Sequence, residues 1–261
     1  MINAYSIRQS FVKKLIKKIF NKFGFEIKRK NNWYDRHRDS VVEINKKIEK
    51  IISKSSKLIN ASVPNQWAII QSLQHIKKNK IKGDIVETGV FHGGGLVLIN
   101  ETLKYLKLKK NIWGYDTFKG VPNQDFKYDK ILGIKKKIKI KNLQNENKNL
   151  YSELYKVKKY LKNNGFKRIP KLVKGDTRKT LKIKKNIPKK IAFLRLDTDF
   201  YESTLNELKT FFPLISKNGV LMIDDYGHHL GCKKAVDEYF KNKNIWMHRI
   251  DYTARLIIKN K

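Results

Sequence analysis

Three aspartates near the ends of two apolar segments have the residue type and spacing of a cation site. Asp197 ends the segment "KIAFLRLD", and Asp224 and Asp225 end "GVLMIDD", 27 and 28 residues further on. Carboxylates that lie close together cannot all stay ionised without a compensating positive charge. Ligands that are all oxygen indicate a hard divalent cation, Mg²⁺ first, with Ca²⁺ or Mn²⁺ as alternatives. In the competing interpretation Asp225 caps the next helix and Asp199 pairs with a lysine.

A second group of residues, in "DIVETGVFHGGG" (84–95), is suited to holding a small ligand. Glu87 ends an apolar stretch and is followed by Gly89, Gly93 and Gly94. Glycine permits a tight turn and a close approach of a ligand to the backbone. The spacing differs from G-x-G-x-x-G, and no lysine follows in a P-loop pattern. A glycine turn between a strand and a helix, without any ligand, is the alternative.

Asp116, in "GYDTFKGVP", follows the next apolar segment along the chain. A carboxylate at the end of that strand is placed to accept hydrogen bonds from both hydroxyls of a ribose. A turn or helix-cap aspartate is the alternative. Together, Glu87, the glycines and Asp116 suggest a nucleoside ligand without a pyrophosphate. S-adenosylmethionine fits that description. Asp176, in "VKGDTRKTL", is then placed for the adenine amino group.

The elements that must position these carboxylates alternate between strands and helices. Short connections between them predict a mostly parallel sheet with helices on both faces, and ligands bind such sheets at the carboxyl ends of the strands. A long insert rich in lysine, asparagine and glutamine interrupts the pattern at about 121–150. Strands are predicted at 83–90, 111–116, 170–176, 190–197 and 219–225, with a closing pair at 247–252 and 254–259; helices are predicted at 66–79, 94–107, 152–166, 203–215 and 232–242.

Residues 1–60 are predicted to form a basic, helical N-terminal arm, separate from a domain at 61–261. In 7–23, "IRQSFVKKLIKKIFNKF", apolar residues fill one half of a helical circumference and lysines the other. This helix either packs on protein, in the domain or in a second subunit, or lies on an anionic membrane surface. A second, weaker helical pattern covers 41–52.

The composition favours a folded cytoplasmic protein with one large α/β domain. The chain has 261 residues, of which 40% are hydrophobic, and no apolar run approaches the roughly 20 residues that cross a bilayer. The single Cys232 fits a reducing compartment. A formal charge of +36 suggests a nucleic-acid partner, but lysine greatly outnumbers arginine and is spread over the chain. A nucleic-acid partner is therefore not favoured.

Six segments, in this order, resemble the macrocin O-methyltransferase family over about 60–261. The resemblance implies a class I methyltransferase fold, Rossmann-like, with a mostly parallel seven-stranded sheet. It also implies S-adenosylmethionine as methyl donor and a required Mg²⁺ ion. The segments are "GDIVETGVFHGG", "YDTFKGVP", "VKGDTRKTL", "LRLDTDFYEST", "DDYGHHLGCKKAVDEYF" and "RIDYTARL".

The resemblance also implies roles for individual residues. The metal ligands fall on Asp197, Asp224 and Asp225, and Asp197 is in addition the expected general base. His228 and His229 are alternative bases, because they follow the metal aspartates in a loop at the same edge of the sheet. Independently of the roles that the resemblance implies, the residues predicted to bind the donor are Glu87, Thr88, Gly89, Gly93, Gly94, Asp116, Thr117, Phe118, Asp176, Thr177 and Asp197.

The predicted reaction transfers a methyl group to a hydroxyl of a sugar, in a surface glycan, a nucleotide sugar or a natural-product glycoside. RNA methylation is an alternative motivated by the charge, although "DTDFYEST" has no N/D-P-P-Y/F pattern. A non-catalytic module that holds a glycan-assembly complex at a membrane is another. A homo-oligomer is expected, with peripheral attachment to the inner membrane face through the basic helix as a further hypothesis.

Overall fold

The computed structural model divides the chain into two units, Met1–Ser40 and Val41–Lys261. In the first unit, Ile16, the stretch 18–20 and Lys22 are helical, and the rest of the predicted 7–23 helix lies outside the described residues. Most of the insert at 121–150 lies outside them as well. The described residues are 16, 18–20, 22–23, 41–55, 58–120, 122, 127–130, 132 and 152–260.

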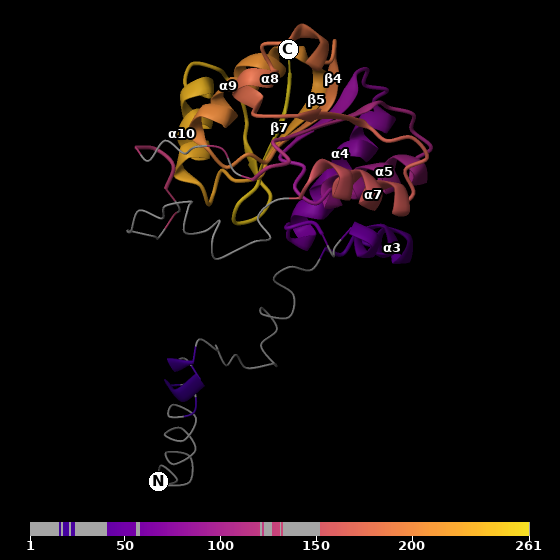
Figure 1. The fold of residues 1–261 in the computed structure, drawn as a ribbon, viewed down its shortest axis with the longest axis horizontal. Helices are drawn as coiled ribbons and strands as arrows, with labels where there is room; N and C mark the ends of the chain where they lie inside the picture. The colour runs from indigo at the N-terminus through magenta and orange to yellow at the C-terminus, as the bar shows by residue number, and fades with distance from the viewer. Residues whose placement is uncertain are drawn as a thin grey trace. The chain divides into compact units, whose positions relative to one another are not determined.

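The second unit contains a seven-stranded sheet in the order β3-β2-β1-β4-β5-β7-β6. Figure 1 labels β4, β5 and β7 of this sheet. The pairs β1–β2, β1–β4, β2–β3 and β4–β5 are parallel, whereas β7 is antiparallel to both β5 and β6. The mostly parallel sheet is therefore as predicted. The strands are β1 (Asp84–Thr88), β2 (Ile112–Asp116), β3 (Lys171–Lys174), β4 (Ile191–Leu196), β5 (Ile215–Ile223), β6 (His248–Arg249) and β7 (Arg255–Ile258).

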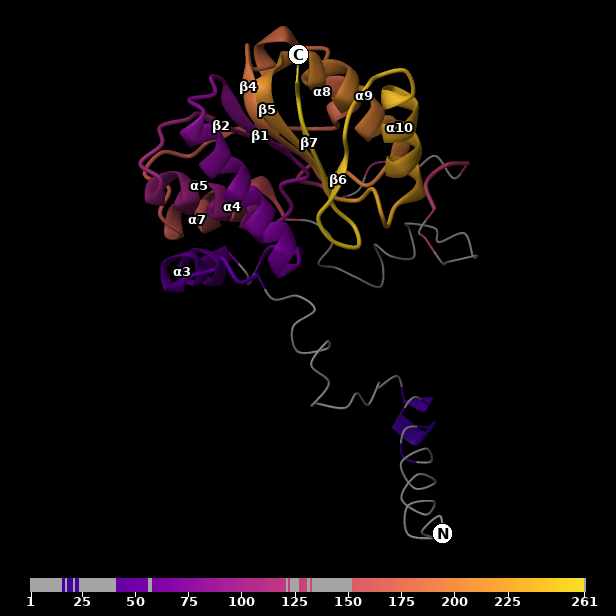
Figure 2. The same ribbon diagram turned by 180° about the vertical axis from the view of Figure 1, so that it is seen from behind.

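Helices cover both faces of the sheet, because successive strand residues point to opposite sides. Ile85 and Phe193 belong to a core shared with α4, α5 and α7, whereas Val86 and Leu194 belong to a core shared with α9 and α10. Figures 1 and 2 show these two layers. The helices are α3 (Lys46–Ser55), α4 (Val63–Lys78), α5 (Gly94–Tyr105), α7 (Leu154–Asn163), α8 (Thr177–Thr180), α9 (Tyr201–Phe211) and α10 (Leu230–Phe240), with 3₁₀ turns η1 (Lys184–Asn186) and η2 (Phe212–Leu214).

The compact unit begins earlier than the boundary predicted at residue 60. Helix α3 buries Ile48, Ile51 and Ile52 in the same apolar core as α4 and α5. These side chains recur at helical spacing on one face, which packs against α5. The described residues 41–55 and 58–60 therefore belong to the compact unit and not to the arm. Within the described part of the chain, no helix combines the length and apolarity needed to span a membrane.

Candidate active site

The three aspartates singled out in the sequence meet at the carboxyl edge of the sheet. Strands β4 and β5 are parallel neighbours with Leu196 opposite Ile223, so the residues that follow each strand lie side by side. The Asp224 amide also donates to the Leu196 carbonyl at 2.9 Å. One carboxylate oxygen from each of Asp197, Asp224 and Asp225 lies within 4.8 Å of the other two. We call these three residues the carboxylate cluster.

A buried arginine supports the cluster, and sequence reasoning missed it. Arg195, which is 2% exposed, places Nη1 at 2.8 Å from Glu87 Oε1 and 2.8 Å from Asp197 Oδ2. Its Nη2 lies 3.1 Å from Asp224 Oδ2. The available signal was a lone charged residue inside the apolar strand "IAFLRL". A charge in such a strand requires buried partners of opposite sign.

Glu87 is a partner of Arg195 and has no exposed surface for a ligand. Burial raises the pKa of this carboxyl to about 7, against the opposing effect of Arg195. Gly95 makes room for it, since a Cβ there would lie 2.0 Å from Glu87 Oε1. Glu87 therefore holds Arg195 from within the core, and its predicted contact with the donor stays a prediction.

The carboxylate cluster carries more negative charge than Arg195 can balance. Burial and the neighbouring carboxylates raise the pKa of Asp197 and of Asp225 well above their usual range. The buried side-chain atoms without a hydrogen-bond partner in the described residues include Asp225 Oδ2, Asn65 Oδ1 and Glu87 Oε2. Excess carboxylate and unpartnered oxygens are what a hard divalent cation would satisfy. The residues present fit such an ion.

The two candidate histidines occupy different surroundings. His229, with Asp199 and Asp225, forms a second set of metal-type side chains, and its Nε2 lies 3.7 Å from Asp199 Oδ1. His228 instead forms a hydrogen bond through Nδ1 with the Tyr252 hydroxyl. Burial lowers the pKa of both imidazoles, which favours the neutral, proton-accepting form. Of the two, only His229 is grouped with the carboxylates.

The glycines after β1 have separate structural reasons. Gly93 ends the turn with φ +92 and faces Val157 and Leu161 of α7. A Cβ at Gly94 would lie 2.5 Å from the backbone at residues 58 and 59. Packing between protein segments therefore explains Gly93 and Gly94. Gly89, with φ +78, lies directly against Asp197 and borders the carboxylate cluster.

Asp116 joins the two loops at which a nucleoside was expected. Its Oδ2 accepts from the Phe91 amide at 2.8 Å and its Oδ1 from the Phe118 amide at 2.7 Å. The Thr117 hydroxyl donates to the Gly120 carbonyl. The Phe118 ring is buried in the apolar core, so this residue can offer only its backbone to a ligand. Asp116 itself is only partly buried, so a ligand can reach it.

Asp176 caps α8 and is occupied by Arg178. Its Oδ1 accepts from the Arg178 amide at 2.9 Å, and the guanidinium contacts both carboxylate oxygens at 2.6 to 3.0 Å. Burial would raise the pKa of Asp176, but the Arg178 contacts outweigh it and lower the pKa. This is the helix-cap arrangement, and it competes with the predicted contact to adenine.

A second buried carboxylate, Glu207 of α9, was also missed in the sequence. Its Oε2 accepts from the hydroxyls of Thr88 at 2.9 Å and Thr198 at 3.0 Å. Thr88 and Thr177 are both buried, and Thr177 interacts with the same carboxyl. Two of the predicted donor-binding residues therefore hold Glu207 in place, between the ends of β1, β3 and β4.

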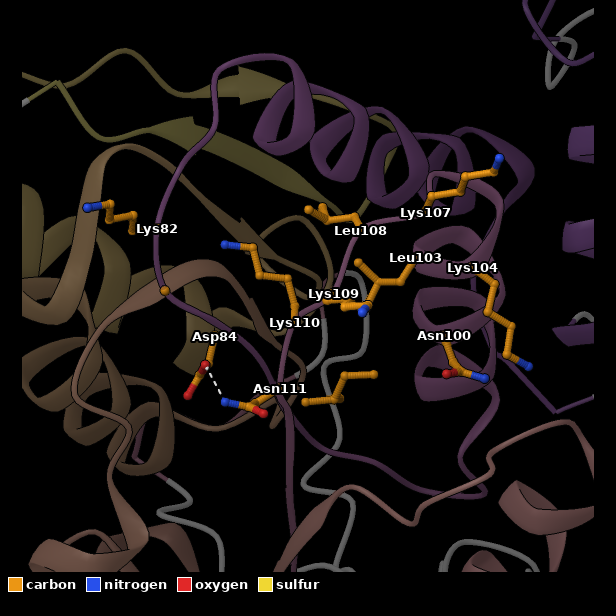
Figure 3. A pocket seen from close by; sticks show the side chains of 12 residues that line it. Lys82, Asp84, Asn100, Leu103, Lys104, Lys107, Leu108, Lys109, Lys110 and Asn111 are labelled. Carbon is orange, nitrogen blue, oxygen red and sulfur yellow. Dashed lines mark hydrogen bonds between the residues drawn. The ribbon is translucent and has the colours of Figure 1, made fainter.

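A lysine-lined depression of about 740 Å³ lies at the opposite edge of the sheet (Figure 3). Its lining includes Lys82, Asp84 and Ile112, which lie at or next to the starts of β1 and β2. Asp84 in the depression accepts from the Asn111 amide at 3.1 Å. The carboxylate cluster follows the other ends of the strands. This depression is therefore separate from the site described above.

Comparison with known proteins agrees with this architecture. A family model described as macrocin O-methyltransferase (TylF) matches residues 66–258. Demethyldecarbamoylnovobiocin O-methyltransferase of Streptomyces niveus is 32% identical over 177 residues, 66% of this chain and 63% of the relative. Mycinamicin III 3''-O-methyltransferase of Micromonospora griseorubida is 28% identical over 183 residues, 65% of this chain and 66% of the relative. The matches thus span just under two thirds of each relative.

A solved structure gives the same answer for the fold. The structure of the O-methyltransferase NovP aligns with a TM-score of 0.66 and 26% identity, covering 77% of this chain and 81% of that one. The family match extends from the residue after Asn65 to the end of β7 and includes the whole carboxylate cluster. The chain belongs to the macrocin O-methyltransferase family.

Proposed function

We propose that the protein is an S-adenosylmethionine-dependent and divalent-cation-dependent O-methyltransferase that acts on a hydroxyl of a sugar. The observation that carries the proposal is the meeting of Asp197, Asp224 and Asp225 beside the Gly89 turn. Family membership and the names of both relatives, which describe O-methylation, support it. The acceptor would be a surface glycan, a nucleotide sugar or a natural-product glycoside.

The donor would bind along the loops after β1 and β2. When bound, S-adenosylmethionine supplies an electrophilic methyl group on a sulfonium, whose leaving group is a neutral thioether. Asp116, which is partly exposed between these loops, would accept hydrogen bonds from the ribose hydroxyls. Gly89 lies directly against Asp197, so the turn after β1 would present its backbone to the donor beside the carboxylate cluster. Alignment of donor and acceptor is the main task of these residues.

The carboxylate cluster would hold the cation, with Mg²⁺ first among the candidates. A bound divalent cation acts as a Lewis acid that lowers the pKa of an acceptor hydroxyl. Arg195 offsets part of the negative charge and holds Asp197 and Asp224 in fixed orientations. The acceptor proton would pass to Asp197 or to His229, since His228 is engaged with Tyr252.

The proposal is tested by Asp224→Asn, with Asp237→Asn as the matched control. Asp237 is an exposed aspartate of α10 that pairs with Lys233 and accepts from the Tyr226 hydroxyl, and it is not a member of the cluster. We expect Asp224→Asn to abolish Mg²⁺-stimulated transfer of labelled methyl to a panel of nucleotide sugars and glycans. Its donor affinity in calorimetry should stay within about threefold, because the contacts to the donor are elsewhere. The control should behave as wild type.

Other outcomes of the same assays would contradict the proposal. Full activity of Asp224→Asn in the presence of a chelator would disprove the proposed dependence on a cation. Donor binding without turnover on any glycan would favour a non-catalytic module, and salt-sensitive RNA binding at physiological ionic strength would favour RNA methylation. Mass spectrometry of cell-surface glycans with and without the protein would identify the acceptor through a lost methyl increment.

The basic N-terminal arm would bring the enzyme to anionic partners. We propose a cytoplasmic, self-associating enzyme whose residues 1–30 attract anionic substrates or lipids through their lysines. Deletion of residues 1–30 should reduce co-sedimentation with anionic vesicles, and an unchanged co-sedimentation would contradict this role. Size-exclusion chromatography with light scattering would test self-association.

A further inference from the structure

We infer that Asn65 is a further residue of the cation site, one that orients Asp224 and offers its amide oxygen to the coordination shell of the ion. The inference rests on the proposed function, because it concerns the same carboxylate cluster. Asn65 lies in the first turn of α4, far from the cluster in sequence. Its Nδ2 donates to Asp224 Oδ1 at 2.6 Å, and the residue is 1% exposed.

Helix capping does not explain this side chain. The N-cap of α4 is Ser62, whose hydroxyl oxygen accepts a hydrogen bond from the backbone N–H of Asn65 at 3.2 Å. The Ser62 hydroxyl also lies 2.5 Å from Asp251 Oδ2, which fixes the start of the helix on the loop before β7. Because Ser62 already caps the helix, the side-chain amide of Asn65 is not needed for capping and can bond to Asp224.

The orientation of the Asn65 amide follows from its partner. An ionised carboxylate only accepts hydrogen bonds, so the NH₂ group and not the oxygen must face Asp224. The amide oxygen then points elsewhere, and it is buried with no hydrogen-bond partner in the described structure. A buried, unpartnered oxygen costs free energy unless a ligand or water satisfies it.

Asp225 Oδ2, in the same cluster, is also buried and unpartnered. Two such oxygens beside an excess of carboxylate are suited to a hard cation and its bound water. A neutral amide oxygen adds a ligand of the preferred type without adding further negative charge. Asn65 therefore has a place at the cation site that a purely structural residue would not need.

Asn65 and Arg195 each contact one of the two carboxylate oxygens of Asp224. Arg195 Nη2 lies 3.1 Å from Oδ2, and Asn65 Nδ2 lies 2.6 Å from Oδ1. Partners that orient a metal-binding carboxylate typically change metal affinity by about 10- to 100-fold when removed. Loss of Asn65 should therefore weaken cation binding even though the three aspartates remain.

The experiment measures Mn²⁺ binding to the full-length chain by electron paramagnetic resonance of the free ion and by calorimetry. We expect Asn65→Ala to weaken Mn²⁺ binding at least tenfold. Asn65→Leu, which restores packing without either polar atom, should do the same if the alanine variant folds poorly. Ser62→Ala is the matched control, since it removes the cap of the same helix: its melting temperature should fall, and its Mn²⁺ affinity should stay within twofold.

The outcomes separate this inference from the proposed function. If wild type binds Mn²⁺ and both Asn65 variants bind it equally well, Asn65 has only a structural role and the inference is overturned, while the cation site stands. If wild type shows no saturable Mn²⁺ binding, the cation dependence itself fails and the inference with it. Equal losses in Ser62→Ala and Asn65→Ala would also overturn it, by showing that helix stability is responsible.

Discussion

Gly89 lies so close to Asp197 that a Cβ there would stand 1.7 Å from the Asp197 carbonyl oxygen. The turn after β1 therefore rests directly on the chain that follows β4. The Gly89 amide also donates to the Tyr115 carbonyl at 2.8 Å, which ties the same turn to β2. This contact brings the proposed donor turn against the first aspartate of the carboxylate cluster.

Gly89→Ala should destabilise the protein and weaken donor binding. A residue with a side chain at φ +78 costs about 1–2 kcal/mol, and the contact with the Asp197 backbone adds to that cost. Urea denaturation and donor calorimetry provide the measurements. Gly165→Ala is the control, because Gly165 has φ +89 but its nearest neighbour is the flexible tip of Lys104. Equal losses in the two variants would disprove the role assigned to the backbone contact.

Arg195→Met should cost about 3–5 kcal/mol of unfolding free energy in chelator at pH 7. Removal of the guanidinium leaves the buried Glu87 and Asp224, and the partly buried Asp197, without their cationic partner. Arg178→Met, at a more exposed ion pair with Asp176, should cost about 1 kcal/mol or less. Equal losses of unfolding free energy in the two variants, measured by denaturation, would contradict this account of Arg195.

Glu207→Gln should change the pH dependence of stability. Burial raises the pKa of Glu207 to about 7 from an ordinary 4.5, against the hydrogen bonds from its threonine partners. The folded state thus holds this proton more tightly than the unfolded state. The stability that the proton contributes is fully present below pH 4.5 and is lost as the pH rises through 7.

The glutamine variant cannot lose this proton. The unfolding free energy of the variant minus that of wild type should therefore increase by about 3 kcal/mol in total between pH 4.5 and 7. Denaturation at a series of pH values measures the difference. The exposed Glu202 lies on the same helix, and Glu202→Gln should show no such trend. A constant difference between Glu207→Gln and wild type would contradict the raised pKa.

Asp116→Ala and Asp176→Ala should differ in their effect on donor binding. Asp116 is partly exposed where the loops meet, and its loss should weaken S-adenosylmethionine binding about tenfold or more. Asp176 is engaged with Arg178, so its loss should cost about 1 kcal/mol of stability and little donor affinity. Calorimetry with the donor decides, and a large loss in Asp176→Ala would restore the predicted adenine contact.

His229→Gln should reduce kcat about 100-fold, whereas His228→Gln should change it less than threefold. His229 is grouped with Asp199 and Asp225, and His228 is bound to Tyr252. Activity of the wild type should fall at acid pH, as His229 gains a proton below its lowered pKa. The variant should lack that acid limb in kcat/KM. An intact limb in His229→Gln would assign the proton transfer to Asp197.

Local patterns were sufficient for most of the fold. Apolar runs predicted the five parallel strands, and the closing pair at 247–259 was found close to its predicted place. The spacing of Asp197, Asp224 and Asp225 was informative because both segments end at the same edge of a parallel sheet. The domain boundary was less accurate, since the apolar face of α3 gives no indication of what it packs against.

What the sequence by itself determined is the alternation of elements, the edge at which the carboxylates gather and the family. Only the tertiary structure decided that Arg195 bridges Glu87 and the cluster, that Glu207 holds Thr88 and Thr198, and that Asn65 reaches Asp224. The physical reason is that periodicity reports which face of an element is buried. The partner of a buried polar group depends on strand order and on side chains that come from distant parts of the chain.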